Sequence, residues 1–499
     1  MSPDVTRIAC DVAVIGGGTA GCVVAGRLAA ETDAEVVLVE AGPDYGPRDS
    51  GRWPADLLDA GALAATHGWG YSSGALAGRE PIQFSRARVI GGCSAHNGCV
   101  AAVGCPEDYD TWVALTGDPA WGADAVRPLL RRALDRLRVR HYADDELGPF
   151  HQACLEAAAA AGYPRLDDLD DLDGAVGFGS EPVNVEAGVR FNAAFAYLDP
   201  ARSLPNLRIL DGALCDRLVP AGGATEVVLL RQGEEVRFRA RTVVLAAGAY
   251  GSPAILQRSG VGDPARLEEA GIPTLLESLG VGANLHDHPL VEIAYAGTEV
   301  LREAQRVAAA TRFVPEEQTL GKLRSSRAAG PYDVHLFPVA SGPQSLLGEG
   351  TWLVVAALEP RSRGSLHVRS TDPLQAPAID HAYLADEDGH DLAVLVEGVE
   401  RARELAAAGP LAALLGAELS PGPDADLAGA IAKTHTHYFH PVGTCAMGAG
   451  AEAVCDGHGR VRGLDGVVVA DCSLLPIVPR ANTNIPAAVV GERIAGLLA

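Results

Sequence analysis

This sequence lacks the features that mark membrane and secreted proteins. No apolar run reaches the length of a membrane-spanning helix, and the opening residues Met1-Ser2-Pro3-Asp4 have neither the basic nor the apolar region of a signal peptide. The ten cysteines form no CxxC pair, and several fall within predicted strands or helices, as buried thiols of a cytoplasmic protein do. We therefore expect a cytoplasmic protein without a membrane span.

Positive charge is also scarce. Lysine and arginine number 40 against 64 aspartates and glutamates, which gives a formal net charge of −24 at pH 7. This balance argues against nucleic acid or an anionic membrane as a partner; it is compatible with a neutral or cationic substrate, and it also serves solubility. The 499 residues suffice for two or three domain-sized cores, and the 58 glycines, which form no repeat, suit a fold that brings backbone close to a ligand.

What the sequence does contain is a dinucleotide-binding motif near its beginning. The apolar run Asp11–Ile15 predicts a buried parallel strand, the glycine-rich turn Gly16–Gly21 follows, and an Ala/Val/Leu-rich helix continues to Ala30. A second strand, Glu35–Glu40, ends in an acid. A GxGxxG pattern alone is weak evidence for a dinucleotide site. Here the flanking strands, the helix and the acid disfavour the alternative that the glycines serve only a tight turn.

Each part of this motif has a mechanical task. We expect Gly16 to make the tight turn, Gly18 to let the backbone approach a pyrophosphate, and Gly21 to let the helix pack closely on the strand. Free N–H groups at the start of the helix attract phosphates. The Glu40 carboxylate can accept hydrogen bonds from ribose hydroxyls. The motif itself does not decide between FAD and NAD.

Later segments predict a fold built from discontinuous pieces. Thr242–Ala249 and Gly466–Asp471 have the apolar character of buried parallel strands. Between residues 290 and 436 the pattern changes to separated strands and one long helix over 391–407, which predicts a second domain on an antiparallel sheet. The predicted class is α/β: a Rossmann-like domain assembled from several segments, with a second α+β domain.

A histidine near the C-terminal end could supply acid–base chemistry. His440 stands in the segment Tyr438–Thr444, and Asn482 follows in the segment Arg480–Asn484. A histidine fixed by Pro and Gly neighbours, with a second polar side chain from a later turn, can remove a proton from a substrate hydroxyl. Histidines beside Pro or Gly often serve only a turn, so the pair alone decides nothing.

The histidines of this region do not predict a metal site. His435, His437 and His440 alternate at i, i+2, which fits a strand better than a metal-binding helix. His286 and His288 are further histidines, but no carboxylate or cysteine completes a ligand set. The acidic stretch 167–173 lacks the DxDxDG spacing and closing glutamate of a calcium loop. We therefore expect no bound metal.

The order and spacing of further motifs give the chain a family resemblance. Besides the two terminal segments, the motifs are Arg88–Asn97, Ser259–Gly262, Asp287–Pro289 and Arg361–Gly364. Together they resemble the glucose–methanol–choline (GMC) oxidoreductases, a flavoprotein family, and within it most closely the choline oxidases, almost from end to end. The resemblance implies FAD rather than NAD as the cofactor.

The resemblance also assigns roles to single residues. His440 matches the family's active-site histidine, which assists proton removal from the alcohol and stabilises the alkoxide, and Asn482 matches a second position that faces flavin N5. His335 matches a pocket histidine that hydrogen-bonds the substrate oxygen, although a lone strand histidine is often a satisfied core residue. His96 matches the histidine that carries the flavin through a covalent bond to its 8α carbon; the alternative is an ordinary buried histidine bonded to backbone.

On the same basis we assign residues to the cofactor and segments to two domains. The predicted FAD contacts are Gly16, Gly18, Thr19, Ala20, Gly21, Glu40, Gly92, His96, Asn97, Cys215, Ala247, Asp471 and Asn482. The predicted FAD-binding domain comprises residues 1–150, 190–289 and 437–499, and the predicted substrate-binding domain comprises residues 151–189 and 290–436.

Departures from the choline oxidases concern substrate recognition. Leu290 stands where they have a glutamate that faces the trimethylammonium group, and Gly98 replaces a serine. Their aromatic residues around the ammonium group have no clear counterpart in the region 300–331. Glu292 would point to the same strand face as Leu290, as a displaced carboxylate. Because a cation needs a paired charge or an aromatic face to bind away from water, we predict a larger or uncharged alcohol.

The predicted function is FAD-dependent oxidation of a small-molecule alcohol to an aldehyde or ketone by hydride transfer to flavin N5. O2 or another electron acceptor is the second partner, and a homodimer is the candidate assembly. One alternative is a lyase of the hydroxynitrile lyase type, in which the same fold binds flavin without reducing it. The other is a flavin-binding protein without turnover, which the intact His440 and Asn482 disfavour.

Overall fold

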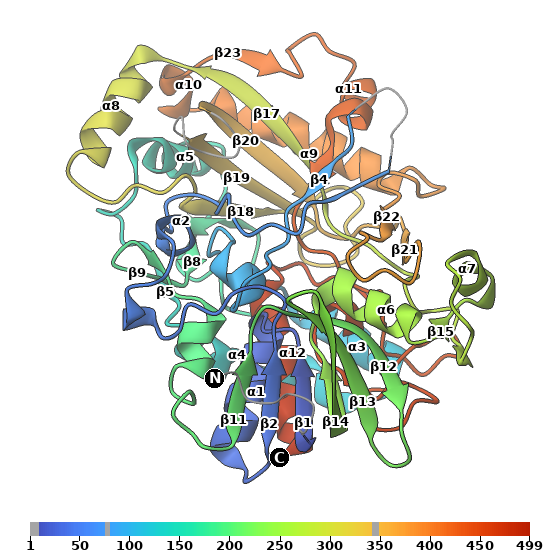
Figure 1. Ribbon diagram of the computed structural model, residues 1–499. Helices are drawn as coiled ribbons and strands as arrows, with labels where there is room; N and C mark the ends of the chain where they lie inside the picture. Colours follow the sequence, from blue (N-terminus) through green and yellow to red (C-terminus); the bar gives the residue numbers. More distant parts are fainter. Residues whose placement is uncertain (1–8, 75–79, 342–348) are drawn as a thin grey trace.

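Two β-sheets organise the protein, one above the other in Figure 1. The computed structural model describes residues 9–74, 80–341 and 349–499; the opening residues Met1–Asp4, where no signal peptide is predicted, lie outside this range. The lower sheet contains the parallel strands of the nucleotide-binding unit and the upper sheet is antiparallel, which confirms the predicted fold class. None of the helices in the described ranges is both long and apolar enough to cross a membrane.

The lower sheet joins segments that are far apart in the sequence. Its parallel strands are β11 (Leu207–Leu210), β2 (Val36–Val39), β1 (Ala9–Ile15), β14 (Glu234–Leu245) and β25 (Val467–Val469). All residues of β2 and β25 are buried, as expected for parallel strands that are covered on both faces. The segments predicted as parallel strands from their apolar character therefore all belong to this sheet.

β14 begins earlier than the predicted strand Thr242–Ala249. Its first half pairs antiparallel with β13 (Thr225–Arg231), which pairs with β12 (Ala213–Pro220), and only its last residues pair with β25. Exposed and buried positions alternate near its start, as in a strand with one solvated face. The chain then enters α6 (Gly248–Arg258).

The two ends of the described chain meet beside this sheet. Helix α1 (Thr19–Glu31) packs against α12 (Asn484–Leu498), and Figure 1 shows them as blue and red elements side by side. A Cβ added to Gly491 would lie only 2.8 Å from the Cβ of Val23, so the helices touch closely. The C-terminal segment that carries Asn482 is thereby anchored to the nucleotide-binding motif.

The upper sheet contains eight of the described strands. They are β23 (Leu415–Ser420), β17 (Pro289–Gly297), β20 (Gly350–Ala357), β19 (Val334–Ser341), β18 (Thr319–Leu323), β7 (Gly177–Ser180) and β6 (Arg165–Leu166), in this order, with β24 (Thr436–His437) also paired to β17. All pairs are antiparallel except β6 with β7. The antiparallel sheet predicted for the region 290–436 is therefore present, and strands from residues 165–180 extend it.

The two faces of the upper sheet have different neighbours. On one face, Leu336 of β19 belongs to a hydrophobic core with α9 (His390–Ala406), the long helix that the sequence predicts. Because strand side chains alternate, His335 and Phe337 lie on the opposite face. Phe337 belongs to a separate hydrophobic cluster that includes Tyr438. This second face is therefore the one turned toward the histidine-containing C-terminal segment.

The remaining described α-helices and strands connect these elements. They are α2 (Ala55–Leu58), α3 (Pro106–Thr116), α4 (Ala123–Arg136), α5 (Pro149–Ala160), α7 (Pro264–Glu269), α8 (Glu299–Ala309), α10 (Leu411–Leu414), α11 (Leu427–Thr434), β3 (Tyr71–Ser72), β4 (Gln83–Phe84), β5 (Arg140–His141), β8 (Pro182–Val183), β9 (Val185–Glu186), β10 (Val189–Arg190), β15 (Val261–Gly262), β16 (Leu276–Glu277), β21 (Ser365–His367) and β22 (Ala378–Asp380).

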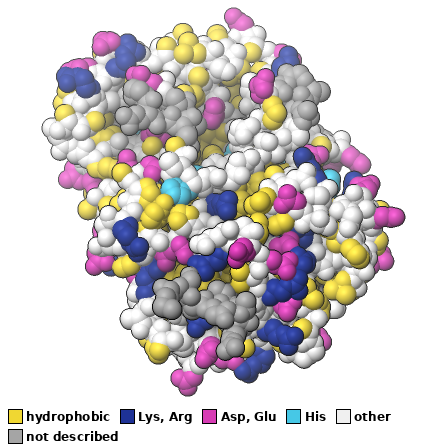
Figure 2. Space-filling view, viewed as in Figure 1, with side chains coloured by type: hydrophobic (Ala, Val, Ile, Leu, Met, Phe, Trp, Pro, Cys, Tyr) yellow, Lys and Arg dark blue, Asp and Glu magenta, His cyan; other side chains and the backbone are white. Residues whose placement is uncertain are grey.

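On the face that Figure 2 shows, charges of both signs are mixed rather than gathered into one patch. Figure 2 shows acidic and basic side chains interspersed across one face of the molecule, with hydrophobic side chains between them. The net charge of −24 therefore does not form a continuous acidic surface on this face.

Several histidines lie in the interior and are uncharged there. Burial lowers the pKa of His151, His288 and His437 to about 3 in each case. A histidine whose folded pKa lies below its unfolded value is neutral in the native protein and binds a proton on unfolding near pH 6. It therefore contributes stability above pH 6.5 that is lost as the pH falls.

We predict that His151→Gln makes the stability of the protein less sensitive to acid. His151 contacts the Thr319 hydroxyl at 3.0 Å and lies in the core of the upper part, so glutamine can keep one hydrogen bond without titrating. Below pH 6.5, the unfolding free energy of the variant should fall by about 1.4 kcal/mol less per pH unit than that of the wild type. Denaturant unfolding of both proteins at several pH values measures this difference. Identical pH dependence would contradict a neutral buried ring.

Candidate active site

The glycine-rich turn has the geometry that dinucleotide binding requires. Gly16 adopts a φ of +105°, and a Cβ on it would lie 2.5 Å from the carbonyl oxygen of Ala246. A Cβ on Gly21 would lie 1.9 Å from the oxygen of Gly16, so helix and strand pack without room for a side chain. By contrast, the nearest atom to a Cβ added at Gly18 is 3.9 Å away. The first and last glycines close the turn, and Gly18 borders open space.

The start of α1 is free to receive a phosphate. Its N-cap is Gly18, and no side chain caps the first N–H groups at Thr19 and Ala20. Gly92 approaches the same place, since a Cβ on it would lie 2.6 Å from the Gly18 Cα. Free N–H groups and the helix dipole both favour an anion there. A pyrophosphate therefore fits the backbone at this turn.

Glu40 directly follows β2 in this site. Its two carboxylate oxygens accept hydrogen bonds from the backbone N–H groups of Gly17 at 2.8 Å and Gly42 at 2.7 Å. Burial raises its pKa to about 7, and the two backbone hydrogen bonds oppose that shift. Each oxygen retains a second lone pair, so the side chain can also accept a hydrogen bond from a ribose hydroxyl.

His96 is buried between Thr66 and Ser85. Its Nε2 lies 2.6 Å from the Thr66 carbonyl oxygen, and its Nδ1 lies 3.4 Å from the Ser85 hydroxyl. A carbonyl only accepts, so Nε2 carries the proton; burial lowers the ring's pKa and keeps it neutral. Asn97 follows it and accepts a hydrogen bond from the N–H of Cys99 at 3.1 Å. Attack on a flavin through Nε2 would require that nitrogen to leave the Thr66 carbonyl.

Asp471 and Ala247 lie just beyond the ends of β25 and β14. Asp471 accepts hydrogen bonds from the N–H of Gly248 at 2.8 Å and from the Ser252 hydroxyl at 2.5 Å, and so fixes the start of α6. The N–H of Ala247 donates to the same serine at 3.1 Å. Both residues are thus held at the carboxyl ends of parallel strands, where Rossmann-type sheets bind their ligands.

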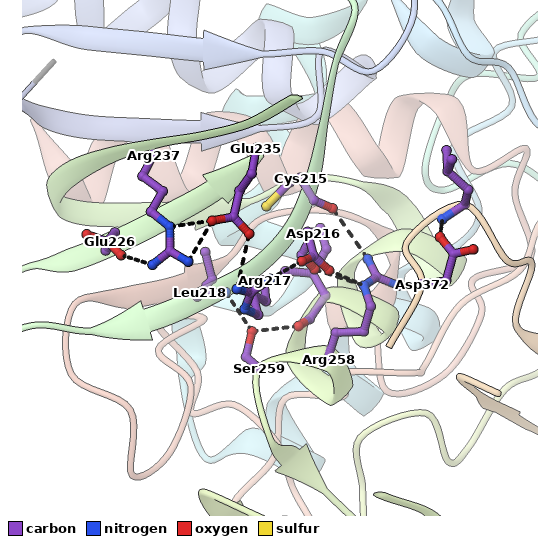
Figure 3. Close-up of polar contacts among 12 residues, drawn as sticks. Cys215, Asp216, Arg217, Leu218, Glu226, Glu235, Arg237, Arg258, Ser259 and Asp372 are labelled. Atoms are coloured by element: carbon purple, nitrogen blue, oxygen red, sulfur yellow. Dashed lines mark hydrogen bonds and ion pairs between the residues drawn. The ribbon is translucent and has the colours of Figure 1, made fainter. Parts of the chain in front are cut away.

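Cys215 lies on β12 beside a buried ion pair (Figure 3). Its carbonyl oxygen accepts a hydrogen bond from Arg258 at 3.3 Å, and Arg258 pairs with Asp216 at 3.1 Å. Figure 3 shows the sulfur pointing away from this pair. Burial raises the pKa of the thiol to about 12, so it is uncharged. A contact of Cys215 with FAD would therefore use its thiol side, and this contact stays a prediction.

His440 lies on a segment that runs antiparallel to the Asp287–Pro289 motif. The N–H of Tyr438 donates to the His288 carbonyl at 3.1 Å, and the N–H of His440 donates to the Asp287 carboxylate at 2.9 Å. Burial raises the pKa of Asp287 to about 6, and the hydrogen bond from His440 opposes that shift. The backbone of the histidine is thus fixed by a motif more than one hundred residues earlier in the chain.

The His440 ring has two side-chain neighbours. Its Nδ1 lies 3.0 Å from the Nδ1 of His288, and its Nε2 lies 3.5 Å from the amide nitrogen of Asn482. Because an amide nitrogen only donates, these contacts favour the tautomer with the proton on Nδ1 and the lone pair on Nε2. Burial first, and then His288 and Arg86, lower the pKa of His440 well below its ordinary value. The ring is neutral, and its basic nitrogen faces Asn482.

A buried ion pair fixes the turn that carries Asn482. The Arg480 guanidinium pairs with the carboxylates of Asp108 and Glu359, and the Arg480 N–H donates to Asp108 at 3.0 Å. The Tyr332 hydroxyl donates to the Arg480 carbonyl at 3.2 Å. Such a pair holds its geometry because loss of either partner leaves an uncompensated buried charge. The Asn482 amide oxygen has no hydrogen-bond partner among the described residues and is available to a ligand.

His335 reaches the same site from β19. Its Nδ1 lies 3.5 Å from the Tyr438 hydroxyl, and the Tyr438 ring lies against His440 with 4.4 Å between ring centroids. Burial first, and then the charge of Lys322, lower the pKa of His335 well below its ordinary value. Its Nε2 is buried with no partner within the described ranges. The structure therefore gathers His335, His440 and Asn482 around one tyrosine.

The alternating histidines are not one ligand set. His437 donates a hydrogen bond from Nε2 to the Gln83 carbonyl oxygen at 2.8 Å, so that nitrogen carries the proton and is not available to a metal. However, Asp287 lies within 4.8 Å of the ring nitrogens of His288 and His440. The prediction that no carboxylate lies with these histidines is wrong for His440, because Asp287 comes from a segment that is distant along the chain. The hydrogen bond between the two rings accounts for their contact without an ion.

Two residues of this site are not predicted from the sequence as catalytic neighbours. His288 belongs to a recognised motif, but its contact with the His440 ring depends on the pairing of two distant segments. Lys322 is fully buried on β18 and lies opposite His335 in the strand register. The sequence signal that could have identified Lys322 as a site residue is its position within an otherwise buried strand, because buried lysines are rare.

Sequence comparison decides which family has this arrangement. The GMC oxidoreductase profiles for the N-terminal and C-terminal parts match residues 10–290 and 360–491. The chain belongs to the GMC oxidoreductase family. Choline oxidase from Arthrobacter globiformis is 34% identical, over 98% of this chain and 94% of its own length. The oxygen-dependent choline dehydrogenase of Serratia proteamaculans is 33% identical, over 97% of this chain and 95% of its own.

Solved structures show the same fold. Pyridoxine 4-oxidase from Mesorbium loti superposes with a TM-score of 0.86 at 28% identity, covering 98% of this chain and 99% of its own. A formate oxidase variant from Aspergillus oryzae RIB40, concerned with FAD modification, has a TM-score of 0.86 at 23% identity over 99% and 98% of the two chains, which shows a shared fold alone.

FAD is the cofactor of this GMC oxidoreductase, and the enzyme acts on the CH–OH group of its donors. The residues present fit that cofactor: Gly18 leaves space, the start of α1 offers free N–H groups, and Glu40 retains acceptor capacity. The predicted family, cofactor and enzyme class are confirmed.

We predict that Gly18→Ala and Gly21→Ala separate cofactor binding from folding. Alanine at Gly18 can adopt its φ of −76° and projects into the open space, so the variant should fold normally yet hold FAD weakly. Alanine at Gly21 collides with Gly16 and should lower the unfolding free energy by about 3 kcal/mol. Denaturant unfolding and the flavin content of the purified proteins measure both effects. A Gly18→Ala protein with unaltered FAD affinity would contradict this placement of the pyrophosphate.

Proposed function

We propose that this GMC oxidoreductase oxidises a small-molecule alcohol to an aldehyde or ketone, with His440 as the group that takes the hydroxyl proton. The observation that carries the proposal is the His440 ring, which is buried and neutral and turns its Nε2 lone pair toward Asn482. FAD, when bound, supplies the acceptor for the hydride of the carbinol carbon at its N5 atom. The second partner is O2 or another electron acceptor.

The low pKa of His440 governs when the proton leaves. A buried imidazole is a weak base, because the protein interior disfavours the charged imidazolium. The hydroxyl proton becomes strongly acidic only as the C–H bond breaks and the carbonyl bond forms. We therefore propose that His440 accepts the proton in the same step in which the carbon loses its hydride.

Two further side chains are placed to hold the substrate oxygen. The Tyr438 hydroxyl lies 3.5 Å from Nδ1 of His335; in the tautomer in which this hydroxyl donates to Nδ1, Nε2 carries the proton and is a potential donor. Asn482 offers an amide group on the other side of His440. Donors that face an oxygen as it gains negative charge stabilise the transition state more than the ground state. These contacts support the predicted roles of His335 and Asn482.

The proposed alcohol is not choline and is either larger or uncharged. Leu290 lies in the hydrophobic cluster of Phe337 and Tyr438, so an apolar group stands where choline oxidases have a carboxylate. Glu292 lies two residues further along the same strand face; it is half-buried, and burial raises its pKa.

The strand membership of the two sheets supports the predicted domain division. The cytoplasmic location and the homodimer stay predictions.

We predict that His440→Ala leaves a yellow holoprotein but slows flavin reduction about 10²–10⁴-fold, because the proton acceptor is lost. Anaerobic stopped-flow loss of flavin absorbance, after a screen of alcohols, amino alcohols and sugars, measures the rate. His437→Gln is the matched control: both histidines are 7% exposed, but the His437 ring binds the Gln83 carbonyl. The flavin of His437→Gln should be reduced at a rate within a few fold of the wild-type rate.

The same experiment separates the alternatives. Flavin reduction in His440→Ala at the wild-type rate would contradict the proposed role of the histidine. A wild-type flavin that no alcohol bleaches would instead favour the lyase.

We further propose that His96 carries the flavin covalently. Its buried ring is neutral, which a nucleophile requires, and it lies between the predicted flavin contacts of its own segment. Acid precipitation of the wild-type protein should therefore leave the yellow colour in the pellet, and His96→Ala should release it. Colour in the wild-type supernatant would show that the flavin is held without a covalent bond.

A further inference from the structure

A pair of buried carboxyl groups adjoins the site and has no part in the chemistry above. Glu181 joins β7 to β8, Glu317 precedes β18, and the N–H of Glu181 donates to the Gln318 carbonyl at 2.9 Å. Glu181 is fully buried. Burial, and then the charge of its neighbour, raise the pKa of Glu181 well above its usual range, while burial raises that of Glu317 to about 7. Two such groups share a proton near neutral pH.

Three of the four carboxyl oxygens are buried and receive no hydrogen bond from outside the pair. They are both oxygens of Glu181 and Oε1 of Glu317, and the described residues offer them only the hydrogen bond through the proton that the two carboxyls share. Native proteins satisfy nearly all buried polar atoms, and one shared proton cannot satisfy three oxygens, so the pair requires an explanation. No basic side chain is among the groups that shift the pKa of either glutamate. Apart from the shared proton, the pair therefore lacks both donors and a positive charge.

The pair lies beside the predicted flavin contacts. A Cβ on Gly98, which directly follows those contacts, would lie 3.7 Å from Glu317 Oε2 and 3.8 Å from Leu63, with no described atom closer. Burial, and then the charges of Glu317 and Glu181, raise the pKa of Tyr438, whose ring lies against His440. The carboxyl pair thus lies on the Gly98 side of the site, near the same tyrosine that joins the catalytic histidines.

We propose that Glu181 and Glu317 bind a primary ammonium group of the alcohol substrate. A primary ammonium has one positive charge, which matches the single negative charge of the proton-sharing pair, and three N–H donors for the oxygens that the shared proton leaves unbonded. A quaternary ammonium has no N–H donor and would leave those oxygens unsatisfied, and a hydroxyl has one donor and no charge. The inference rests on the proposed alcohol oxidation and selects, of its two substrate options, a larger alcohol that carries an amine.

The test is the preference of the holoenzyme for ω-amino alcohols over the 1-alkanols that carry a methyl group in place of the ammonium. Anaerobic flavin reduction, measured over a series of chain lengths, gives this preference as a ratio of rate constants. Glu317→Gln keeps the shape of the side chain but removes its charge, so it should lower the preference of the wild type about 100-fold. The 1-alkanols should still reduce Glu317→Gln at nearly the wild-type rate, which shows that its site is intact.

Glu292→Gln is the matched control, because Glu292 is a second half-buried carboxyl, on the strand face of Leu290. It should keep the preference. A preference that is absent in the wild type, unchanged in Glu317→Gln, or lost in Glu292→Gln instead would overturn the proposal.

A binding measurement keeps the test independent of turnover. Butylamine should perturb the flavin absorbance of the oxidised wild-type enzyme and bind about 100-fold more weakly to Glu317→Gln. If no alcohol reduces the flavin, the proposed alcohol oxidation fails, but amine binding still decides the role of the carboxyl pair. Equal binding of butylamine to both proteins would refute that role.

Discussion

Burial keeps the histidines of the candidate active site uncharged, and the geometry of the site depends on that constraint. A neutral imidazole has one donor and one acceptor nitrogen, so each ring can be oriented by one neighbour and still offer its other nitrogen to a ligand. His288 is the neighbour that orients the ring of His440, and Tyr438 is the neighbour that orients the ring of His335. A protonated ring would donate from both nitrogens and could not accept the proton of an alcohol.

Elements from distant parts of the chain bring these rings together. The Asp287–Pro289 motif fixes the backbone of His440, the Arg480 ion pair fixes the turn of Asn482, and β19 presents His335 from the upper sheet. The contact of α12 with α1 connects this assembly to the dinucleotide motif. In the proposed mechanism, reaction and recognition are divided: the C-terminal segment carries the proton acceptor, while the upper sheet and its connecting loops line the substrate side.

Local patterns in the sequence were sufficient to predict the elements that local interactions determine. The glycine-rich turn, with Gly16 and Gly21, and the buried strands around it depend on steric rules that a short window of sequence contains. Likewise, alternation along β19 places His335 on one face without reference to the rest of the fold. The reaction class therefore followed from motifs whose order and spacing are visible in the chain.

Contacts between distant segments could not be predicted in this way. Asp287 was overlooked beside His440 because 153 residues separate them, and Glu181 meets Glu317 only through the pairing of strands β7 and β18. The sequence drew attention to Glu292 as a displaced carboxylate because it lies near Leu290 along the chain. The structure adds a carboxyl pair on another wall of the site, which no spacing rule connects with the substrate.

The central claim is that His440 accepts the proton in the step that breaks the C–H bond. The most direct measurement is the anaerobic rate of flavin reduction with an alcohol deuterated at the carbinol carbon, in H2O and in D2O. A single step predicts that both substitutions slow reduction and that the effect of D2O is undiminished with the deuterated alcohol. A solvent effect that shrinks or disappears with the deuterated alcohol would place the two transfers in separate steps and contradict the account.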